Sequence, residues 1–345
     1  MISRLKTAHL AAILLLAACS SKPGYEERVF SGETQGTTYT VRVVRADFSD
    51  ARTEAVRSAI ASRLARIDSL MSTYRPDSEI SRFNQHAETT PFVVSAEMIE
   101  VLLAARRVSE ASGGAFDVTV APLVRAWGFG PDGAPQPPPP EELERLRGLV
   151  DYRAVEVDAE AGTLRKTRPD VIVDLNGIAQ GYTVDRLAGD LDSLGEENYM
   201  IEIGGEVKGR GHNARGVAWR IGVERPVANV REIAFILPIS NTAVSTSGDY
   251  REYREVDGVR ISHTIDPRTG RPVQHKLASV TVVNPSCTVA DGFSTAIMVL
   301  GPEEGYQLAV KENLAALLVI HSGETFIERQ TPAWGNATGK MMSNE

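Results

Sequence analysis

Cysteine is scarce in this chain: Cys19 and Cys287 are the only two among 345 residues. We expect Cys19 to be modified, so Cys287 would have no partner for an intramolecular disulfide, and the fold must depend on its hydrophobic core. The sequence also has no Cys–His cluster of the kind that binds zinc. No base stands beside Cys287, with Asn-Pro-Ser before it and Thr after it, which favours a structural cysteine over a nucleophile.

Positive charge is in short supply as well. The chain has 37 Lys and Arg against 45 Asp and Glu, a net charge of -8, and no basic stripe. This balance argues against nucleic acid as the main partner. Aromatic residues make up 6% and hydrophobic residues 42%, which is ordinary for a globular protein of one large or two small domains.

Long apolar runs are also missing, because the run at 10–16 is too short for a stable membrane-spanning helix. It follows Arg4 and Lys6, which predicts a signal peptide over 1–18. The residues Leu-Ala-Ala before Cys19 are typical of a bacterial lipobox, so we expect a palmitate-bearing lipoprotein. It would be anchored at the membrane on the extracytoplasmic, periplasmic side, with the inner membrane favoured over the outer. The alternative is an ordinary signal peptide with a chance cysteine. Residues 19–32 are predicted to be the lipidated cysteine and a tether.

The remaining sequence alternates between helical and strand periodicity. The clearest helix covers 51–71 and is capped by Ser49 or Asp50. Further helices are predicted at 95–113, 141–149, 178–194, 288–300 and 303–313, and strands at 37–44, within 154–174, and at 199–203, 218–223, 233–239, 278–283 and 315–320. Loops are expected at 73–84 and 130–140, and a flexible tail at 331–345. This mixture indicates an α+β fold with mixed or antiparallel sheets and flanking helices.

Asp291 and Thr295 are four residues apart on a predicted helix and therefore share a face. A carboxylate and a hydroxyl are hard oxygen ligands, which suit Mg²⁺ or Ca²⁺. The alternative is a helix-start carboxylate and a packed threonine. Residues 174–181, Asp-Leu-Asn-Gly-Ile-Ala-Gln-Gly, place Gly177 where a predicted strand turns into a helix whose N-terminus could face an anion. An ordinary turn explains this segment equally well.

A tight turn is predicted at 263–270, with Asp266 and Pro267 in its first two positions. His263 beside it could take a proton from a hydroxyl nucleophile, or it could be structural. Tyr74 and Phe116 could stack on a planar ring, and Asp117 could bond the edge of a heterocycle. Each of the three is also compatible with a core or loop position.

Taken together and in order, these segments resemble the FAD:protein FMN transferases, the ApbE family. The resemblance spans roughly residues 33–330. It is carried by the blocks beginning Gly36-Thr-Thr-Tyr, Ser72-Thr-Tyr74-Arg-Pro-Asp-Ser-Glu, Ala115-Phe-Asp117-Val-Thr-Val, Val173-Asp174-Leu-Asn-Gly177 and Ser262-His263 through Thr295. Jointly the blocks are specific, although each alone is weak.

The resemblance implies a single catalytic domain related to the tunnelling fold. It also implies transfer of FMN from FAD to a threonine or serine hydroxyl of an acceptor protein, with release of AMP. The acceptors would be electron-transfer subunits at the membrane. Mg²⁺ would be held by the Gly177 carbonyl, Asp291 and Thr295, and His263 would be the catalytic base. The residues expected to contact FAD are Tyr74, Ala115, Phe116, Asp117, Asp174, Gln180 and Ile265. Hydrolysis of FAD to FMN and AMP, or flavin binding without catalysis, are the alternatives.

Three positions depart from the family pattern. Gln35 stands where many relatives have methionine, and Ser294 stands where some have a further aspartate. The residue type at Gln180 varies among relatives. The sequence leaves open the acceptor and the oligomeric state.

Overall fold

The computed structural model describes residues 24–129, 137–226, 233–248, 253–256, 259–323 and 325–338. The predicted signal peptide, Cys19, residues 130–136 of the predicted insertion loop and residues 339–345 of the predicted tail therefore lie outside the described residues. Among those that are described, no helix has both the length and the apolar character needed to cross a membrane.

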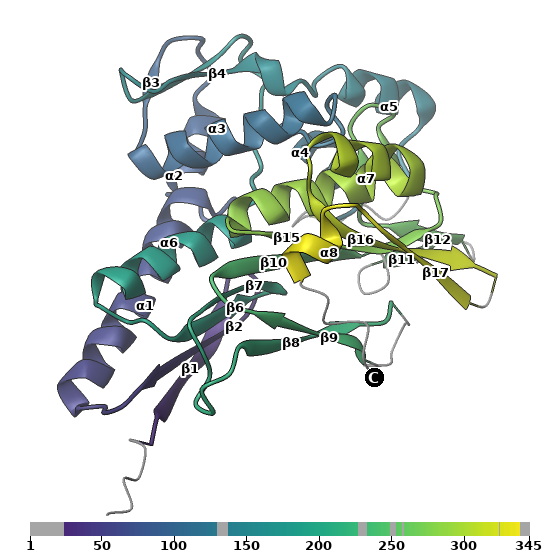
Figure 1. Cartoon of the computed structure of the whole chain (residues 1–345). Coiled ribbons are helices and arrows are strands. Elements are labelled where there is room, and N and C mark those ends of the chain that lie inside the picture. The colour runs from purple at the N-terminus through teal and green to yellow at the C-terminus, as the bar shows by residue number, and fades with distance from the viewer. Residues whose placement is uncertain are drawn as a thin grey trace, which may run out of the picture.

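An eight-stranded antiparallel sheet forms the centre of the protein (Figure 1). Its strands lie in the order β1-β2-β6-β7-β10-β15-β16-β17. Their bounds are β1 Glu26–Thr34, β2 Thr37–Arg45, β6 Tyr199–Ile203, β7 Glu206–Arg210, β10 Thr242–Gly248, β15 Leu277–Asn284, β16 Ala315–Ser322 and β17 Thr325–Gln330. Together with the helices, this sheet confirms the predicted α+β class.

Three helices cover one face of this sheet: α1 (Asp50–Met71), α6 (Ala179–Ser193) and α7 (Cys287–Lys311). A fourth helix, α3 (Ala96–Ala111), packs on the side of α7 that faces away from the sheet. The side chains of Ser49, Ser95 and Ser286 cap α1, α3 and α7 by accepting backbone N–H bonds. The two late helices predicted from the sequence are joined as α7, with a kink at Gly301, whose φ of 80° is not helical. The backbone at Gly301 thus interrupts the helix where the sequence predicted a stop.

Alternate residues of the central strands point to opposite faces, so each of these strands contributes side chains to two separate hydrophobic cores. Ala243 packs with α1 and α6, whereas the next residue, Val244, packs with Trp219 and Trp334. The second core is closed by the hairpin of β8 (Trp219–Glu224) and β9 (Ile233–Ile239) and by α8 (Trp334–Thr338).

A smaller layer of short elements lies next to α3 and to the start of α6. It contains α2 (Glu79–Gln85), α4 (Ala121–Ala126), α5 (Pro140–Arg147), the 3-10 turn Tyr152–Ala154, and a three-stranded sheet of β3 (Phe92–Val93), β5 (Thr163–Lys166) and β4 (Val155–Asp158). The hairpins β11 (Tyr253–Val256) with β12 (Val259–Ser262), and β13 (Ile265–Asp266) with β14 (Arg271–Pro272), complete the described chain.

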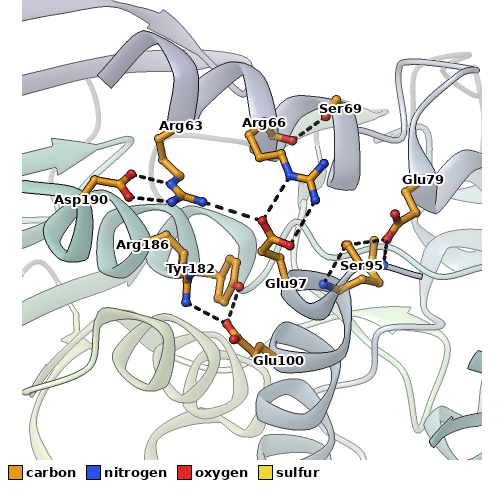
Figure 2. A network of polar contacts seen from close by, with 11 residues as sticks. Arg63, Arg66, Ser69, Glu79, Ser95, Glu97, Glu100, Tyr182, Arg186 and Asp190 are labelled. Carbon is orange, nitrogen blue, oxygen red and sulfur yellow. Dashed lines mark hydrogen bonds and ion pairs between the residues drawn. The ribbon is translucent and has the colours of Figure 1, made fainter. Parts of the chain in front are cut away.

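A network of polar contacts ties three of the helices together (Figure 2). Arg63 of α1 makes a bidentate pair with Asp190 of α6, and Arg66 of α1 makes another with Glu97 of α3. Glu100 of α3 accepts hydrogen bonds from Tyr182 and Arg186 of α6. The network fixes α6 against α1 and α3, and α6 carries one side of the candidate site.

Several sequence predictions were wrong. Residues 26–32, predicted as tether, form most of β1. This edge strand is exposed on most of its length, so it shows no apolar alternation. The tail prediction fails at 331–338 because Trp334 is buried against β9. The predicted loop 73–84 contains α2 from Glu79 onward. Residues 171–175, from which a strand ending at Asp174 was expected, are not part of a helix or a sheet.

The strands β7, β10 and β17 were not predicted at all. Polar residues interrupt all three, which hides the apolar pattern of a strand. In β10, Ser245 and Ser247 face α7 and form hydrogen bonds there, so polarity on the inner face does not mean exposure.

Candidate functional site

The site begins where α6 and α7 come closest. The backbone N–H of Gly181 donates a hydrogen bond to Oδ2 of Asp291 over 2.8 Å. A Cβ at Gly181 would lie 2.5 Å from the Cys287 carbonyl oxygen and 2.6 Å from the Asp291 Cβ, so the contact requires glycine. The first turn of α6 is thereby held against the first turns of α7.

One turn further along α7, Thr295 meets the loop that precedes α6. Its hydroxyl lies 3.4 Å from the carbonyl oxygen of Gly177 and donates to it. The ring of Phe116 also approaches Gly177, because a Cβ there would lie 3.0 Å from Phe116 Cε2. The structure therefore brings together the three residues that were expected to hold a metal ion, Gly177, Asp291 and Thr295.

Asp291 is buried, and this burial raises the pKa of its carboxyl to about 7, against a smaller opposing effect of the Gly181 hydrogen bond. The burial of Glu206, followed by the charge of Asp291, raises the pKa of the Glu206 carboxyl well above its usual range. The two carboxyl groups are thus both buried and lie within electrostatic range of each other.

Sequence reasoning missed Glu206. It follows directly after the Gly204–Gly205 turn between β6 and β7, and its burial is visible only in the tertiary structure. Its Oε1 accepts a hydrogen bond of 3.3 Å from Ser245, while its buried Oε2 has no hydrogen-bond partner.

Ser294 lies between Asp291 and Thr295 on α7 but points toward β10. Its hydroxyl lies 3.0 Å from that of Ser245 and 2.9 Å from that of Ser247, and it donates to the Asp291 carbonyl over 3.0 Å. Ser294 is thus engaged in a serine cluster that joins α7 to the sheet.

The donors at this junction are all oxygens: two carboxylates, a hydroxyl and a backbone carbonyl. Within the described ranges there is no group of three or more His, Cys, Asp and Glu side chains that could bind a metal. The oxygens of Asp291, Thr295 and the Gly177 carbonyl are hard donors of the kind that suit a cation such as Mg²⁺, and further ligands would have to complete the set.

The loop 115–117 packs beside this junction. Ala115, Phe116 and Asp117 are buried, and burial raises the pKa of the Asp117 carboxyl. Its Oδ1 accepts hydrogen bonds from the backbone N–H and the hydroxyl of Thr119, and its Oδ2 accepts one from the Tyr152 N–H. Asp117 therefore shapes its own loop, and a flavin contact of its side chain stays a prediction.

Asp174 is joined to the same loop. Its N–H donates to the Val118 carbonyl over 2.7 Å, and its Oδ1 accepts from the N–H of Asn176. Burial raises the pKa of the Asp174 carboxyl. The backbone connection holds the 115–117 loop and the 174–177 loop side by side at the N-terminal end of α6.

Gln180 and Gln35 border the junction from the sheet side. The Gln180 amide lies against Gly204, since a Cβ there would be 2.8 Å from its Oε1. Gln35, in the β1–β2 turn, donates to the Thr183 hydroxyl of α6 over 2.8 Å. Gln35, which departs from the methionine of many relatives, thus has a polar partner in this chain.

The remaining predicted residues lie on other segments. Tyr74 is 66% exposed on the loop after α1. Ile265 is buried with Leu123, Leu143 and Leu146, which leaves its side chain little surface for a ligand. His263 lies two residues before β13, which packs beside α7, and its ring contacts Phe129 edge-on at 6.4 Å between centroids. The 263–270 turn has the predicted form, because the Asp266 carbonyl accepts hydrogen bonds from Thr269 and Gly270.

Comparison with known proteins extends these observations to most of the chain. The ApbE family model matches residues 35–318. The chain is 44% identical over 321 residues to the FAD:protein FMN transferase of Vibrio cholerae, covering 92% of this chain and 94% of that protein. It is 35% identical over 340 residues to that of Escherichia coli, covering 96% of each.

Solved structures show the same relationship. The flavin transferase ApbE from Vibrio cholerae superimposes with a TM-score of 0.83 at 41% identity, over 91% of this chain and 99% of that one. The apo form of the Pseudomonas stutzeri flavinyl transferase ApbE gives a TM-score of 0.83 at 39% identity, over 91% and 98% of the two chains. By fold and by sequence along most of its length, this chain belongs to the ApbE family.

Proposed function

We propose that this protein transfers FMN from FAD to a threonine or serine hydroxyl of an acceptor protein in a Mg²⁺-dependent reaction. The relatives named above are FAD:protein FMN transferases. The observation that carries the proposal is the meeting of the Gly177 carbonyl, the Thr295 hydroxyl and the Asp291 carboxylate at the α6–α7 junction. These oxygens form an acidic, oxygen-rich site beside the loops 115–117 and 174–177, which we expect to contact the flavin nucleotide.

In this reaction the acceptor oxygen forms a bond to the phosphorus atom on the riboflavin side of the FAD pyrophosphate. The bond from that phosphorus to the bridging oxygen breaks, and AMP leaves with this oxygen. The hydroxyl proton passes to a base, for which His263 is our candidate. A bound Mg²⁺ ion would supply neutralisation of the pyrophosphate charge. Asp291, Thr295 and the Gly177 carbonyl would hold it.

The chain's own residues supply the nucleotide site. The exposed ring of Tyr74 is available to stack on a planar ring. The loops at 115–117 and 174–177 are joined by a backbone hydrogen bond and lie at the N-terminal end of α6, where a helix favours a phosphate. Gln180 borders the same end. Ile265, being buried, would contact FAD through its backbone.

We also propose that the protein is anchored through a lipid on Cys19 and acts on membrane-associated electron-transfer proteins in the periplasm. The proposal rests on the N-terminal sequence. The two ends of β1 lie apart: Gln35 contacts α6 beside the site after one end, and Glu26 begins the strand at the other, from which the sequence continues toward Cys19. Nine residues of strand separate these ends by about 30 Å. An anchored enzyme would thus hold its site away from the lipid surface.

The test incubates the purified full-length lipoprotein in detergent with FAD, Mg²⁺ and a candidate acceptor domain. Covalent flavin fluorescence on the acceptor, with one AMP released per label, is the expected result. FMN and AMP without a labelled protein would show a FAD pyrophosphatase instead, and intact FAD would show a flavin-binding protein.

Two variants test the residue assignments. Asp291→Ala, like EDTA, is expected to abolish labelling. His263→Ala is expected to slow transfer far more than it weakens FAD binding. His212→Ala is the matched control, since His212 packs against Tyr25 at the end of β1 remote from the site. Equal turnover of the two histidine variants would show that His263 has no role in the transfer step.

A further inference from the structure

Glu206 is the buried carboxylate that the proposed reaction leaves without a task. Only 6% of its surface is exposed, and its Oε2 has no hydrogen-bond partner. A buried, unpaired carboxylate oxygen is costly unless a proton, a donor or a cation satisfies it. We propose that Glu206 is a further ligand of the divalent cation held by Asp291, an inference that rests on the proposed Mg²⁺-dependent function.

The position of Glu206 is set by the sheet. Val207 of β7 pairs with Val244 of β10, which places Ser245 beside Glu206, and the Ser245 hydroxyl donates to Glu206 Oε1 over 3.3 Å. Both side chains lie on the face that α7 covers, because the neighbouring residues Val207 and Val244 belong to the core on the opposite face.

From Ser245 the contacts continue to the metal candidates. Its hydroxyl lies 3.0 Å from that of Ser294, and Ser294 donates to the backbone carbonyl of Asp291. The charge of Asp291 also acts directly on the Glu206 carboxyl. The Oε1 oxygen is therefore anchored to the serine cluster, while the buried Oε2 has no partner and its carboxyl lies within electrostatic range of Asp291.

Charge gives the reason for a cation in this place. Two buried carboxylates within electrostatic range repel each other, and a single divalent ion neutralises both. Asp291 already gives one oxygen to the Gly181 N–H, so a second carboxylate would supply a ligand that Asp291 alone cannot. Glu206 reaches the site from the sheet, whereas Asp291 and Thr295 reach it from α7, so the ion would join the two layers.

The experiment measures binding of Mn²⁺, a spectroscopic substitute for Mg²⁺, to the metal-free full-length protein by electron paramagnetic resonance without FAD. Glu206→Gln keeps the shape of the side chain and removes its charge. We expect it to weaken Mn²⁺ binding about 10- to 100-fold. Because it also removes a buried unpaired charge, the metal-free variant should melt no lower than the wild type, which checks that it folds.

The control is Glu196→Gln, which removes another buried carboxylate at the far end of α6, where Glu196 pairs with Arg45 and Arg52. It should lower the melting temperature without changing Mn²⁺ binding. If Glu206→Gln binds Mn²⁺ within twofold of the wild-type affinity, the proposal for Glu206 is overturned. If Asp291→Asn loses Mn²⁺ binding in the same experiment, the metal site at Asp291 is still supported. If the wild type binds no Mn²⁺, both the metal site and the role of Glu206 fail.

Discussion

The contact between α6 and α7 at Gly181 makes the sharpest prediction. Adding one methyl group in Gly181→Ala places it 2.5 Å from the Cys287 carbonyl oxygen and 2.6 Å from the Asp291 Cβ. Both distances are shorter than real contacts, and both partners belong to the helix α7 rather than to a flexible side-chain end. The two helices must therefore move apart.

The expected cost follows from overpacking of a rigid contact, which is about 3 kcal/mol when backbone has to shift. For a chain of 345 residues such a loss lowers the melting temperature by about 4 °C. The same movement lengthens the hydrogen bond from the Gly181 N–H to the Asp291 carboxylate and increases the distance between Asp291 and Gly177. Mg²⁺ binding should therefore weaken more than the loss of stability alone would suggest.

The assay is thermal and urea unfolding of the full-length protein with EDTA and with Mg²⁺. Gly189→Ala is the control, since it makes the same change in the same helix where nothing lies within 4 Å. This variant should gain about 0.5–1 kcal/mol because alanine favours the helix over glycine. If Gly181→Ala were as stable as Gly189→Ala and responded normally to Mg²⁺, the close α6–α7 packing would be refuted.

Three further predictions follow from the buried groups. In EDTA the free energy of unfolding of the wild type should fall as the pH rises from about 4 to about 7, by at most about 1.4 kcal/mol per pH unit. The reason is that Asp291 keeps its proton up to about pH 7 in the folded state but releases it at lower pH when unfolded. In urea titrations at several pH values, Asp291→Asn should flatten this slope, and an unchanged slope would contradict the assignment. Cys287 is fully buried, and burial raises the pKa of its thiol well above the ordinary value. A thiol reagent should therefore label it only after unfolding, as measured by peptide mass spectrometry. Rapid labelling of the folded protein would contradict this expectation. Trp334→Ala should cost about 3–5 kcal/mol in denaturant unfolding, because this ring is buried and packs edge-on against Phe235, whereas a loss below 1 kcal/mol would mean that the C-terminal segment is not part of the core.

Local patterns predicted the elements that have strong local signals. The helices with serine caps and a continuous apolar face were expected within a few residues, as were the strands that alternate or run apolar. The edge strand β1 was not predicted because it is exposed on most of its length and has no apolar alternation. The strand β10 and the helix α8 were not predicted because distant segments bind the serines of β10 and bury Trp334. Spacing along one helix also identified Asp291 and Thr295 as a pair.

The sequence by itself therefore determined the helices α1, α3, α5, α6 and α7, half of the central sheet, the structural character of Cys287 and the oxygen donors on α7, because each of these depends on residues near one another in the chain. Tertiary structure alone decided that Gly177 and Gly181 meet α7, that Glu206 lies within electrostatic range of Asp291, and that Ser294 turns to β10. Periodicity reports whether a side chain is buried but not which segment covers it. That is fixed only when α6, α7 and the sheet pack, since one methyl group at Gly181 would be enough to keep them apart.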